Sequence, residues 1–93
     1  MDPTPKLRID IWLFRARIFK SRALAAEVVE AGHLRLNSQP CSKPGHGVGV
    51  GDVLTFAQGD RIRVLRILAV GDRRGPAGEA RLLYADLAPT DLE

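Results

Sequence analysis

The 93-residue sequence has one cysteine, 5% aromatic residues and no long apolar run. One cysteine cannot form an internal disulfide, so we expect a reducing compartment. Without an apolar run that could serve as a signal peptide or membrane span, we expect a cytoplasmic protein that makes no membrane contact. The few aromatic side chains argue against simultaneous stacking on many bases.

Residue sets typical of catalysis or metal binding are also missing. Cys41, His33 and His46 lack the paired spacing of zinc ligands. The glycines of residues 45–51 match neither the dinucleotide-binding fingerprint nor a phosphate-binding P-loop. No second acid or base accompanies Asp10, for which a role at a helix end is expected. The sequence therefore predicts a protein that is not an enzyme and needs no cofactor or metal.

Positive charge is concentrated in the first half of the chain. Residues 6–43 contain eight Lys or Arg against three acids, whereas residues 44–93 contain six Arg against seven acids. Four cations and no acid fall within residues 15–22. Eleven of the fourteen cations are arginine, whose planar guanidinium suits phosphate. This distribution indicates a polyanionic partner.

Two helices are predicted on either side of the most basic stretch. Apolar residues recur at helical spacing over residues 8–18 and again over 22–31, with Ser21 as N-cap of the second helix. Trp12 could stack on a base, but its place on the apolar stripe favours the core. Phe14 lies off that stripe, and both partial exposure and contact with a partner stay open.

Beyond Gly32 the apolar period changes from helical spacing to two, which is typical of strands. We expect an α+β fold in which two N-terminal helices pack on a small, mostly antiparallel sheet, with a short helical turn near the C-terminus. The expected strands are 34–36, 41–43, 53–56, 61–70 and 82–87. The expected connections are a turn at 37–40 and loops at 44–52 and 71–78, the second of which contains a helical turn opened by Pro76. A bulge or bend is expected at Arg66. The N-terminus (1–6) is expected to be disordered, and residues 89–93 are expected to form a tail.

A series of short motifs runs from residue 8 to residue 52: Arg8-Ile9-Asp10-x-Trp12-Leu13, Arg17-x-Phe19-Lys20-Ser21-Arg22-x-Leu24-Ala25, Glu30-x-Gly32-x-Leu34-x-Leu36-Asn37, Lys43-Pro44 and Gly51-Asp52. This pattern resembles the S-four (S4) RNA-binding domain, or alpha-L motif, over about residues 7–57. Residues 73–77 and 79–84 resemble small ribosome-associated heat-shock proteins that carry this domain. The resemblance implies binding to ribosomal RNA on a large subunit that still holds peptidyl-tRNA. It also implies an RNA-binding core at 7–57 that the strands of residues 58–88 complete.

The cations of the first half are the predicted RNA contacts. Double-helical RNA is recognised mainly through its backbone and shape, which suits a rigid cluster of Arg and Lys on a helix pair. Solvated helix faces are the alternative, which the local excess of cations disfavours. For Arg73 and Arg74, a secondary contact and a solvated loop are equally expected. The predicted RNA-binding residues are Arg8, Arg15, Arg17, Lys20, Ser21, Arg22, Arg35, Asn37 and Lys43.

Two other functions compete with RNA binding by a monomer. A helix-turn-helix DNA-binding protein would present several base-reading side chains on its second helix. That helix offers only Arg22, and Glu27 and Glu30 would repel phosphates. A protein-interaction module that uses the sheet is the other alternative, with the charge serving solubility.

Overall fold

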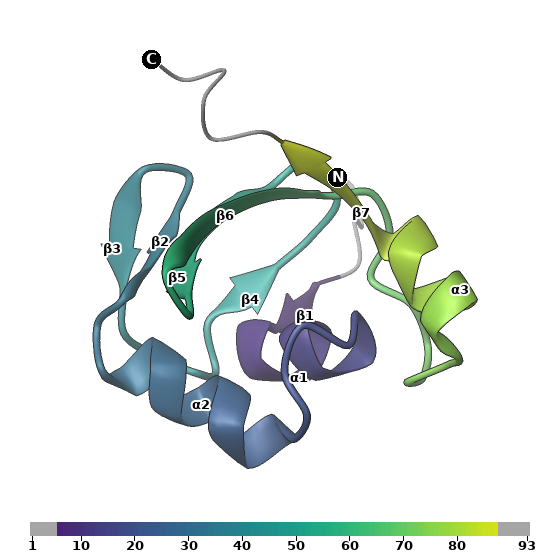
Figure 1. Cartoon of the computed structure of the whole chain (residues 1–93), viewed down its shortest axis with the longest axis horizontal. Coiled ribbons are helices and arrows are strands. Elements are labelled where there is room, and N and C mark those ends of the chain that lie inside the picture. The colour runs from purple at the N-terminus through teal and green to yellow at the C-terminus, as the bar shows by residue number, and fades with distance from the viewer. Residues whose placement is uncertain (1–5, 88–93) are drawn as a thin grey trace.

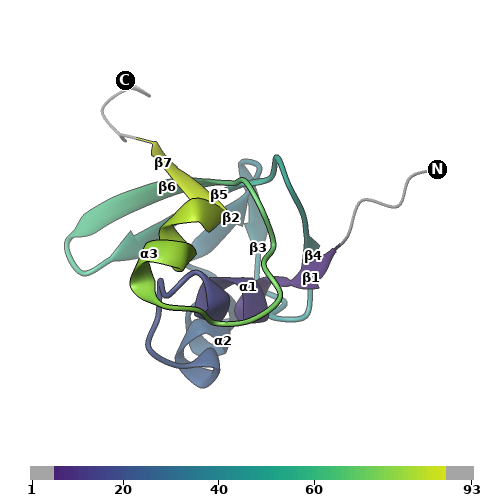
Figure 2. The same cartoon turned by 90° about the vertical axis from the view of Figure 1, so that its right-hand side faces the viewer.

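The computed structural model describes residues 6–87, and its architecture is the predicted α+β fold. Two N-terminal helices, α1 (Ile9–Arg15) and α2 (Arg22–Glu30), lie on one face of a curved antiparallel sheet (Figures 1 and 2). No helix in this part of the chain has the length and apolar character needed to cross a membrane. The predicted disordered N-terminus and tail fall largely outside the described residues. The elements are β1 (Leu7–Arg8), α1 (Ile9–Arg15), α2 (Arg22–Glu30), β2 (Leu34–Leu36), β3 (Gln39–Cys41), β4 (Gly47–Val48), β5 (Val53–Gln58), β6 (Arg61–Ile67), α3 (Ala77–Ala80), the 3-10 helix η1 (Arg81–Leu83) and β7 (Tyr84–Leu87).

The main sheet has the strand order β3-β2-β5-β6-β7, and each neighbouring pair is antiparallel. Its inner face packs on the helices through Leu34, Leu54 and Leu65, which are fully buried. Trp12 of α1 is also fully buried, which confirms the core interpretation over base stacking. Its indole nitrogen donates to the Ala69 carbonyl at 3.0 Å. The chain beyond β6 is thereby fixed to α1.

The prediction that residues 44–52 form only a loop was wrong. Gly47 and Val48 form β4, which pairs with β1 through Leu7 and Val48. The reason lies in the start of α1, whose free amides need acceptors. The amide of Ile9 donates to the His46 carbonyl at 2.8 Å, and the amide of Asp10 donates to the Pro44 carbonyl at 3.2 Å. This segment therefore caps α1.

The first hairpin is tighter than predicted. The turn is confined to Asn37 and Ser38, with positive φ angles of 53° and 71°, and β3 begins at Gln39 instead of residue 41. Two successive left-handed residues match the right-handed twist of a two-residue hairpin, and asparagine tolerates this conformation better than other non-glycine residues. Pro40 is accommodated because β3 is an edge strand.

Three further boundaries differ from the prediction. Helix α1 ends at Arg15 instead of residue 18, because Arg17 has a φ of 59°, which is incompatible with a right-handed helix. Strand β6 ends at Ile67, and its register is continuous on both sides of Arg66, so the strand curves without a bulge (Figure 1). Residues 82 and 83 belong to η1, and β7 starts at Tyr84. The helical turn expected after Pro76 is confirmed as α3.

The N-cap of α2 is confirmed, and it gives a first testable prediction. The Ser21 hydroxyl oxygen accepts a hydrogen bond from the Leu24 amide at 3.0 Å. We expect Ser21→Ala to lower the free energy of unfolding by about 1 kcal/mol, because that amide loses its acceptor. Urea denaturation measures the effect, with Ser42→Ala as the control, since Ser42 is an exposed serine outside the helices. Equal stability of the Ser21→Ala variant and the wild type would contradict the cap.

Candidate nucleic-acid interface

A buried carboxylate joins two of the predicted contact residues. Arg8 donates two hydrogen bonds to Asp10, from Nε to Oδ1 at 3.1 Å and from a terminal nitrogen to Oδ2 at 3.0 Å. The Nε of Arg22 lies 3.7 Å from the same Oδ2. The Asp10 side chain is only 3% exposed, whereas those of Arg8 and Arg22 are 49% and 52% exposed. Asp10 thus holds two guanidinium groups side by side while their outer edges face solvent.

The ion pairs determine the protonation state of Asp10. Burial by itself raises the pKa of this carboxyl, but the hydrogen bonds from Arg8 and the positive charges of Arg8 and Arg22 lower it by more. The backbone amide of Ile11 adds to the lowering. The net pKa of Asp10 is below its ordinary value. The carboxylate is therefore charged at neutral pH and keeps both arginines in place.

This lowered pKa predicts how stability responds to acid. A carboxyl group whose pKa is lower in the folded state than in the unfolded state stabilises the fold. This stabilisation is complete at pH values above the pKa of the unfolded state, and it is lost as the pH falls through the pKa of the folded state. We expect the stability difference between wild type and Asp10→Asn to be constant above about pH 5 and to shrink below about pH 4. Urea denaturation across this range measures it, and a difference that persists undiminished at about pH 2 would contradict the ion pair.

Arg15 and Arg17, at the end of α1, attach a distant loop to the helix. A terminal nitrogen of Arg15 donates to the Gly71 carbonyl at 2.7 Å, and Nε of Arg17 donates to the Gly75 carbonyl at 2.6 Å. Arg17 is exposed and keeps its terminal nitrogens for other partners, whereas Arg15 is half-buried. The Arg15 side chain is therefore less available to an external partner than the Arg17 side chain.

Arg73 and Arg74 contact different partners within the protein. Nε of Arg74 donates to the Phe14 carbonyl at 3.0 Å, and its guanidinium carbon lies 4.6 Å from the centroid of the Phe14 ring. This contact explains why Phe14 is half-buried although it lies off the apolar stripe. Arg73 forms an ion pair with Glu79 at 3.1 Å. Both arginines thus have partners within the protein.

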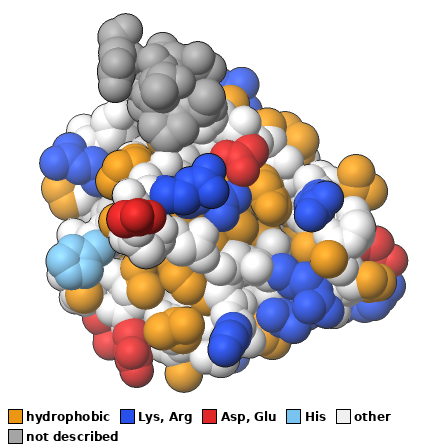
Figure 3. All heavy atoms as spheres, viewed as in Figure 1, with side chains coloured by type: hydrophobic (Ala, Val, Ile, Leu, Met, Phe, Trp, Pro, Cys, Tyr) orange, Lys and Arg blue, Asp and Glu red, His pale blue; other side chains and the backbone are white. Residues whose placement is uncertain are grey.

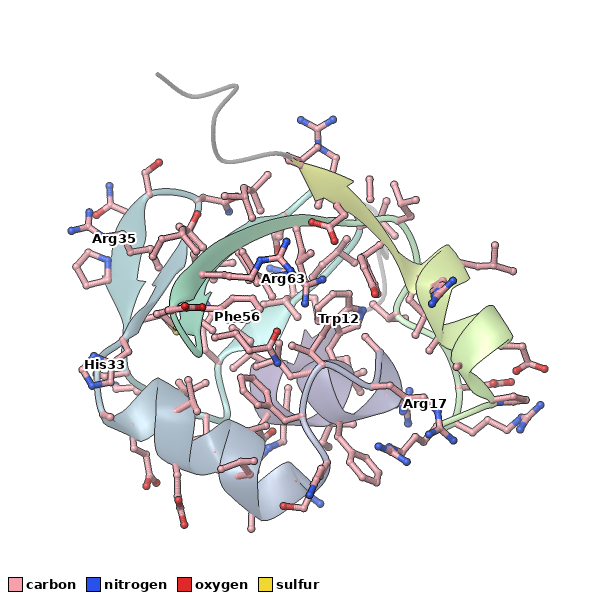
Figure 4. The ribbon with its side chains drawn as sticks, in the orientation of Figure 1. Trp12, Arg17, His33, Arg35, Phe56 and Arg63 are labelled. Atoms are coloured by element: carbon pink, nitrogen blue, oxygen red, sulfur yellow. The ribbon has the colours of Figure 1, made fainter. Side chains whose placement is uncertain are left out.

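The start of α2 adds exposed polar and cationic side chains to those of Arg8 and Arg17. Lys20, Ser21 and Arg22 are all exposed at this helix start, and Lys20 has no ion pair within residues 6–87. The helix dipole also favours an anion here. Figure 3 shows Lys and Arg side chains over the α1–α2 junction and towards α3, and Figure 4 shows Arg17 between the end of α1 and α3. We define the junction surface as Arg8, Arg17, Lys20, Ser21 and Arg22.

Of the three predicted contacts of the first hairpin, only Lys43 adjoins this surface, since it directly precedes the segment that caps the start of α1. Arg35 projects from the outer face of the sheet, opposite Thr55, and lies at the far side of the molecule from Arg17 in Figure 4. The Asn37 side chain is already engaged, since its amide nitrogen donates to Asp52 at 3.0 Å and its oxygen accepts from the Val53 amide at 2.9 Å. Lys43 is exposed beside a hollow of about 510 Å³ under the hairpin. This hollow is lined by Leu36, Asn37, Gln39, Pro40, Cys41, Ser42, Lys43 and His46.

The sequence did not reveal three features of this region. The pairing of Asp10 with Arg8 and Arg22 could have been suspected from an acid isolated among cations. The attachment of the loop at residues 71–75 to α1 had no local signal, because the partners are 56 to 60 residues apart. Gln39 and His46 also line the hollow beside Lys43. Within the described part of the chain, no group of three His, Cys, Asp or Glu is placed to hold a metal ion.

Comparison with known proteins identifies the relatives of this chain. The family model of the S4 domain matches residues 7–54. Heat shock protein 15 of Escherichia coli K12 is 42% identical over 86 residues, which cover 92% of this chain and 64% of that protein. The heat shock protein 15 homolog of Aeromonas salmonicida is 39% identical over 85 residues, 91% of this chain and 64% of the relative. This chain therefore spans less than two thirds of the length of these two relatives.

A solved structure shows the same fold. The trimeric structure of Vibrio cholerae heat shock protein 15 superimposes with a TM-score of 0.85 at 35% sequence identity, and the match covers 95% of this chain and 88% of that one. Both the matched model and this structure agree with the resemblance seen in the sequence motifs. The chain belongs to the S4 domain family.

Proposed function

We propose that this protein binds ribosomal RNA on the large ribosomal subunit and acts in the recycling of stalled subunits that retain peptidyl-tRNA. Membership of the S4 domain family and the similarity to heat shock protein 15 support an RNA-binding protein. The proposal of a ribosomal target goes beyond RNA binding and follows the cellular role that the sequence motifs imply. Cytoplasmic location follows from that target.

The observation that carries the proposal is the junction surface. Arg8 and Arg22 are fixed on one buried carboxylate, and Arg17 is fixed by the Gly75 carbonyl, so three guanidinium groups are oriented before RNA arrives. Orientation in advance reduces the conformational entropy lost on binding. A rigid set of cations can match the phosphate spacing of one RNA helix, whereas freely moving cations would bind any polyanion.

We assign graded roles to the nine predicted contacts. The junction surface supplies the primary phosphate contacts, and Lys43 extends them towards the hairpin. We assign supporting roles to Arg15, which fixes the end of α1 to Gly71, and to Asn37, which fixes the first hairpin to Asp52. Arg35 would meet RNA only if the RNA wraps the edge of the sheet. Residues 7–57 form the proposed RNA-binding core, completed by residues 58–88.

RNA is favoured over the two competing partners. Glu27 and Glu30 are exposed on α2, so this helix would carry negative charge into a DNA major groove. A protein-interaction module would not require Arg8 and Arg22 to be held on a buried acid. We therefore propose a non-enzymatic role in RNA binding, which membership of the S4 domain family supports.

The monomer is the proposed RNA-binding unit, because one chain supplies the whole junction surface. The solved Vibrio cholerae relative is described as trimeric. Light scattering of this protein, free and with RNA, tests the proposal: a monomer in both states supports it, and binding only by a trimer overturns it.

Sedimentation of the tagged protein in a lysate gradient tests the ribosomal target. We expect the protein to migrate with the free large subunit at moderate salt, and more of it to do so after heat shock. Migration near the top of the gradient with RNA bound would contradict the ribosomal target and indicate that the protein binds free RNA or transfer RNA. Absence of nucleic acid in that fraction would overturn RNA binding.

A further inference from the structure

Another concave site lies where residues matched to the S4 domain meet residues beyond the match. It is a hollow of about 200 Å³ where the end of α1 faces α3 and the start of β7. Its volume is well below the roughly 300 to 1,000 Å³ of pockets for drug-sized ligands, so it suits a small group such as one nucleobase. Its lining is Ala16, Arg17, Ala77, Ala80, Arg81 and Tyr84.

The charge of this hollow is positive. Arg17 and Arg81 are both exposed at its rim, and no Asp or Glu is among the lining residues. Glu79 of α3 is engaged with Arg73 at 3.1 Å, and Asp86 of β7 with Arg63 at 2.9 Å. Arg81 makes no ion pair with any other residue in 6–87. Its guanidinium is therefore available to a phosphate or to the face of a base.

The hollow also offers a fixed aromatic ring. Tyr84 is half-buried and meets the Trp12 ring edge to face, with centroids 6.3 Å apart and planes at 79°. The buried indole thus fixes the orientation of Tyr84. Small alanine side chains leave room beside the ring. An aromatic ring and arginines around one hollow are the side chains with which proteins hold unpaired bases of RNA.

We propose that this hollow binds one unpaired nucleotide of the RNA, with its base against Tyr84 and its phosphates on Arg17 and Arg81. The proposal rests on the RNA-binding function proposed above and adds a specificity element to it. Arg17 connects the two sites, because it belongs to the junction surface and also lines the hollow. The junction surface would bind the backbone of an RNA helix, and the hollow would select helices that carry an unpaired residue beside the bound segment.

Two RNA hairpins with the same stem sequence test this proposal, one fully paired and one with a single bulged uridine. We expect the wild type to bind the bulged hairpin about tenfold more tightly, because stacking of one base contributes on this scale. Arg81→Gln and Tyr84→Leu are expected to remove the preference while binding of the paired hairpin persists. Tyr84→Phe is expected to keep the preference, because it keeps the ring.

Arg61→Gln is the matched control, since it removes the same charge from an exposed arginine at the start of β6. Fluorescence of Trp12, the one tryptophan of the chain, reports whether each Tyr84 variant retains its core. Equal wild-type affinity for the two hairpins, or an equal loss on both hairpins in Arg81→Gln, would overturn the hollow as a nucleotide site and leave the proposed function intact. Failure of the wild type to bind either hairpin would overturn both.

Discussion

A variant carrying Arg17→Gln, Lys20→Glu and Arg22→Gln is expected to lose RNA affinity by on the order of a hundredfold at about 0.1 M salt. These three residues supply most of the exposed charge of the junction surface. Their loss should also reduce the steepness of the salt dependence, because fewer counterions are released on binding. Filter binding to large-subunit RNA at several salt concentrations measures both quantities.

The fold is expected to survive these three substitutions. Glutamine at position 22 avoids placing a second acid beside Asp10, which still keeps its two hydrogen bonds from Arg8. Loss of the partly exposed pair between Arg22 and Asp10 should cost no more than about 1 kcal/mol. Circular dichroism and urea denaturation verify this expectation.

The matched control is Arg61→Glu with Arg66→Glu. Two charge reversals lower the net charge as much as one reversal and two neutralisations, and both residues are exposed on β6, away from the helix junction. We expect this control to retain nearly full affinity. Equal loss of affinity in the two variants would show that the protein binds RNA through its net charge alone.

Asp10→Asn is expected to weaken folding and RNA binding together. The isosteric amide loses the charge that holds Arg8 and Arg22, and we expect the free energy of unfolding to fall by about 1 to 3 kcal/mol. The lower end of this range is favoured by the exposure of both arginines, which leaves them hydrated in the variant. Urea denaturation at neutral pH measures the change.

The effect of Asp10→Asn on RNA affinity shows whether binding depends on the positions of Arg8 and Arg22 or only on the net charge of the protein. Asp10→Asn and Glu30→Gln each remove one acid, so each raises the net charge by one. Glu30 is exposed at the end of α2 and lies outside the junction surface. We expect Glu30→Gln to strengthen RNA binding slightly and Asp10→Asn to weaken it. Stronger binding by both variants would contradict the positioning role of Asp10.

Local patterns predicted the elements that build the junction surface. Helical spacing of apolar residues and the N-cap Ser21 were sufficient for α2, because those signals act over one or two turns. Trp12 was correctly assigned to the core for the same reason. The cluster of cations from residue 15 to 22 could likewise be read directly, since the two helices and their junction are contiguous in sequence.

The features that sequence reasoning missed depend on partners far apart in the chain. Strand β4 exists because β1 and the start of α1 offer it hydrogen bonds across about forty residues, as in the bond from Ile9 to His46. The early end of α1 follows from Arg17, whose left-handed backbone is compatible with its bond to Gly75. The two-residue hairpin turn was missed because Asn37 and Ser38 adopt positive φ without a glycine.

Crosslinking offers the most direct test of the claim that the junction surface binds RNA. Ultraviolet irradiation of the wild-type protein bound to large-subunit RNA, followed by mass spectrometry of the crosslinked peptides, identifies the contacted segment. We predict crosslinks concentrated in residues 17–22, and their loss in the Arg17→Gln, Lys20→Glu, Arg22→Gln variant. Crosslinks confined to the strands of the sheet, with residues 17–22 free, would contradict the account.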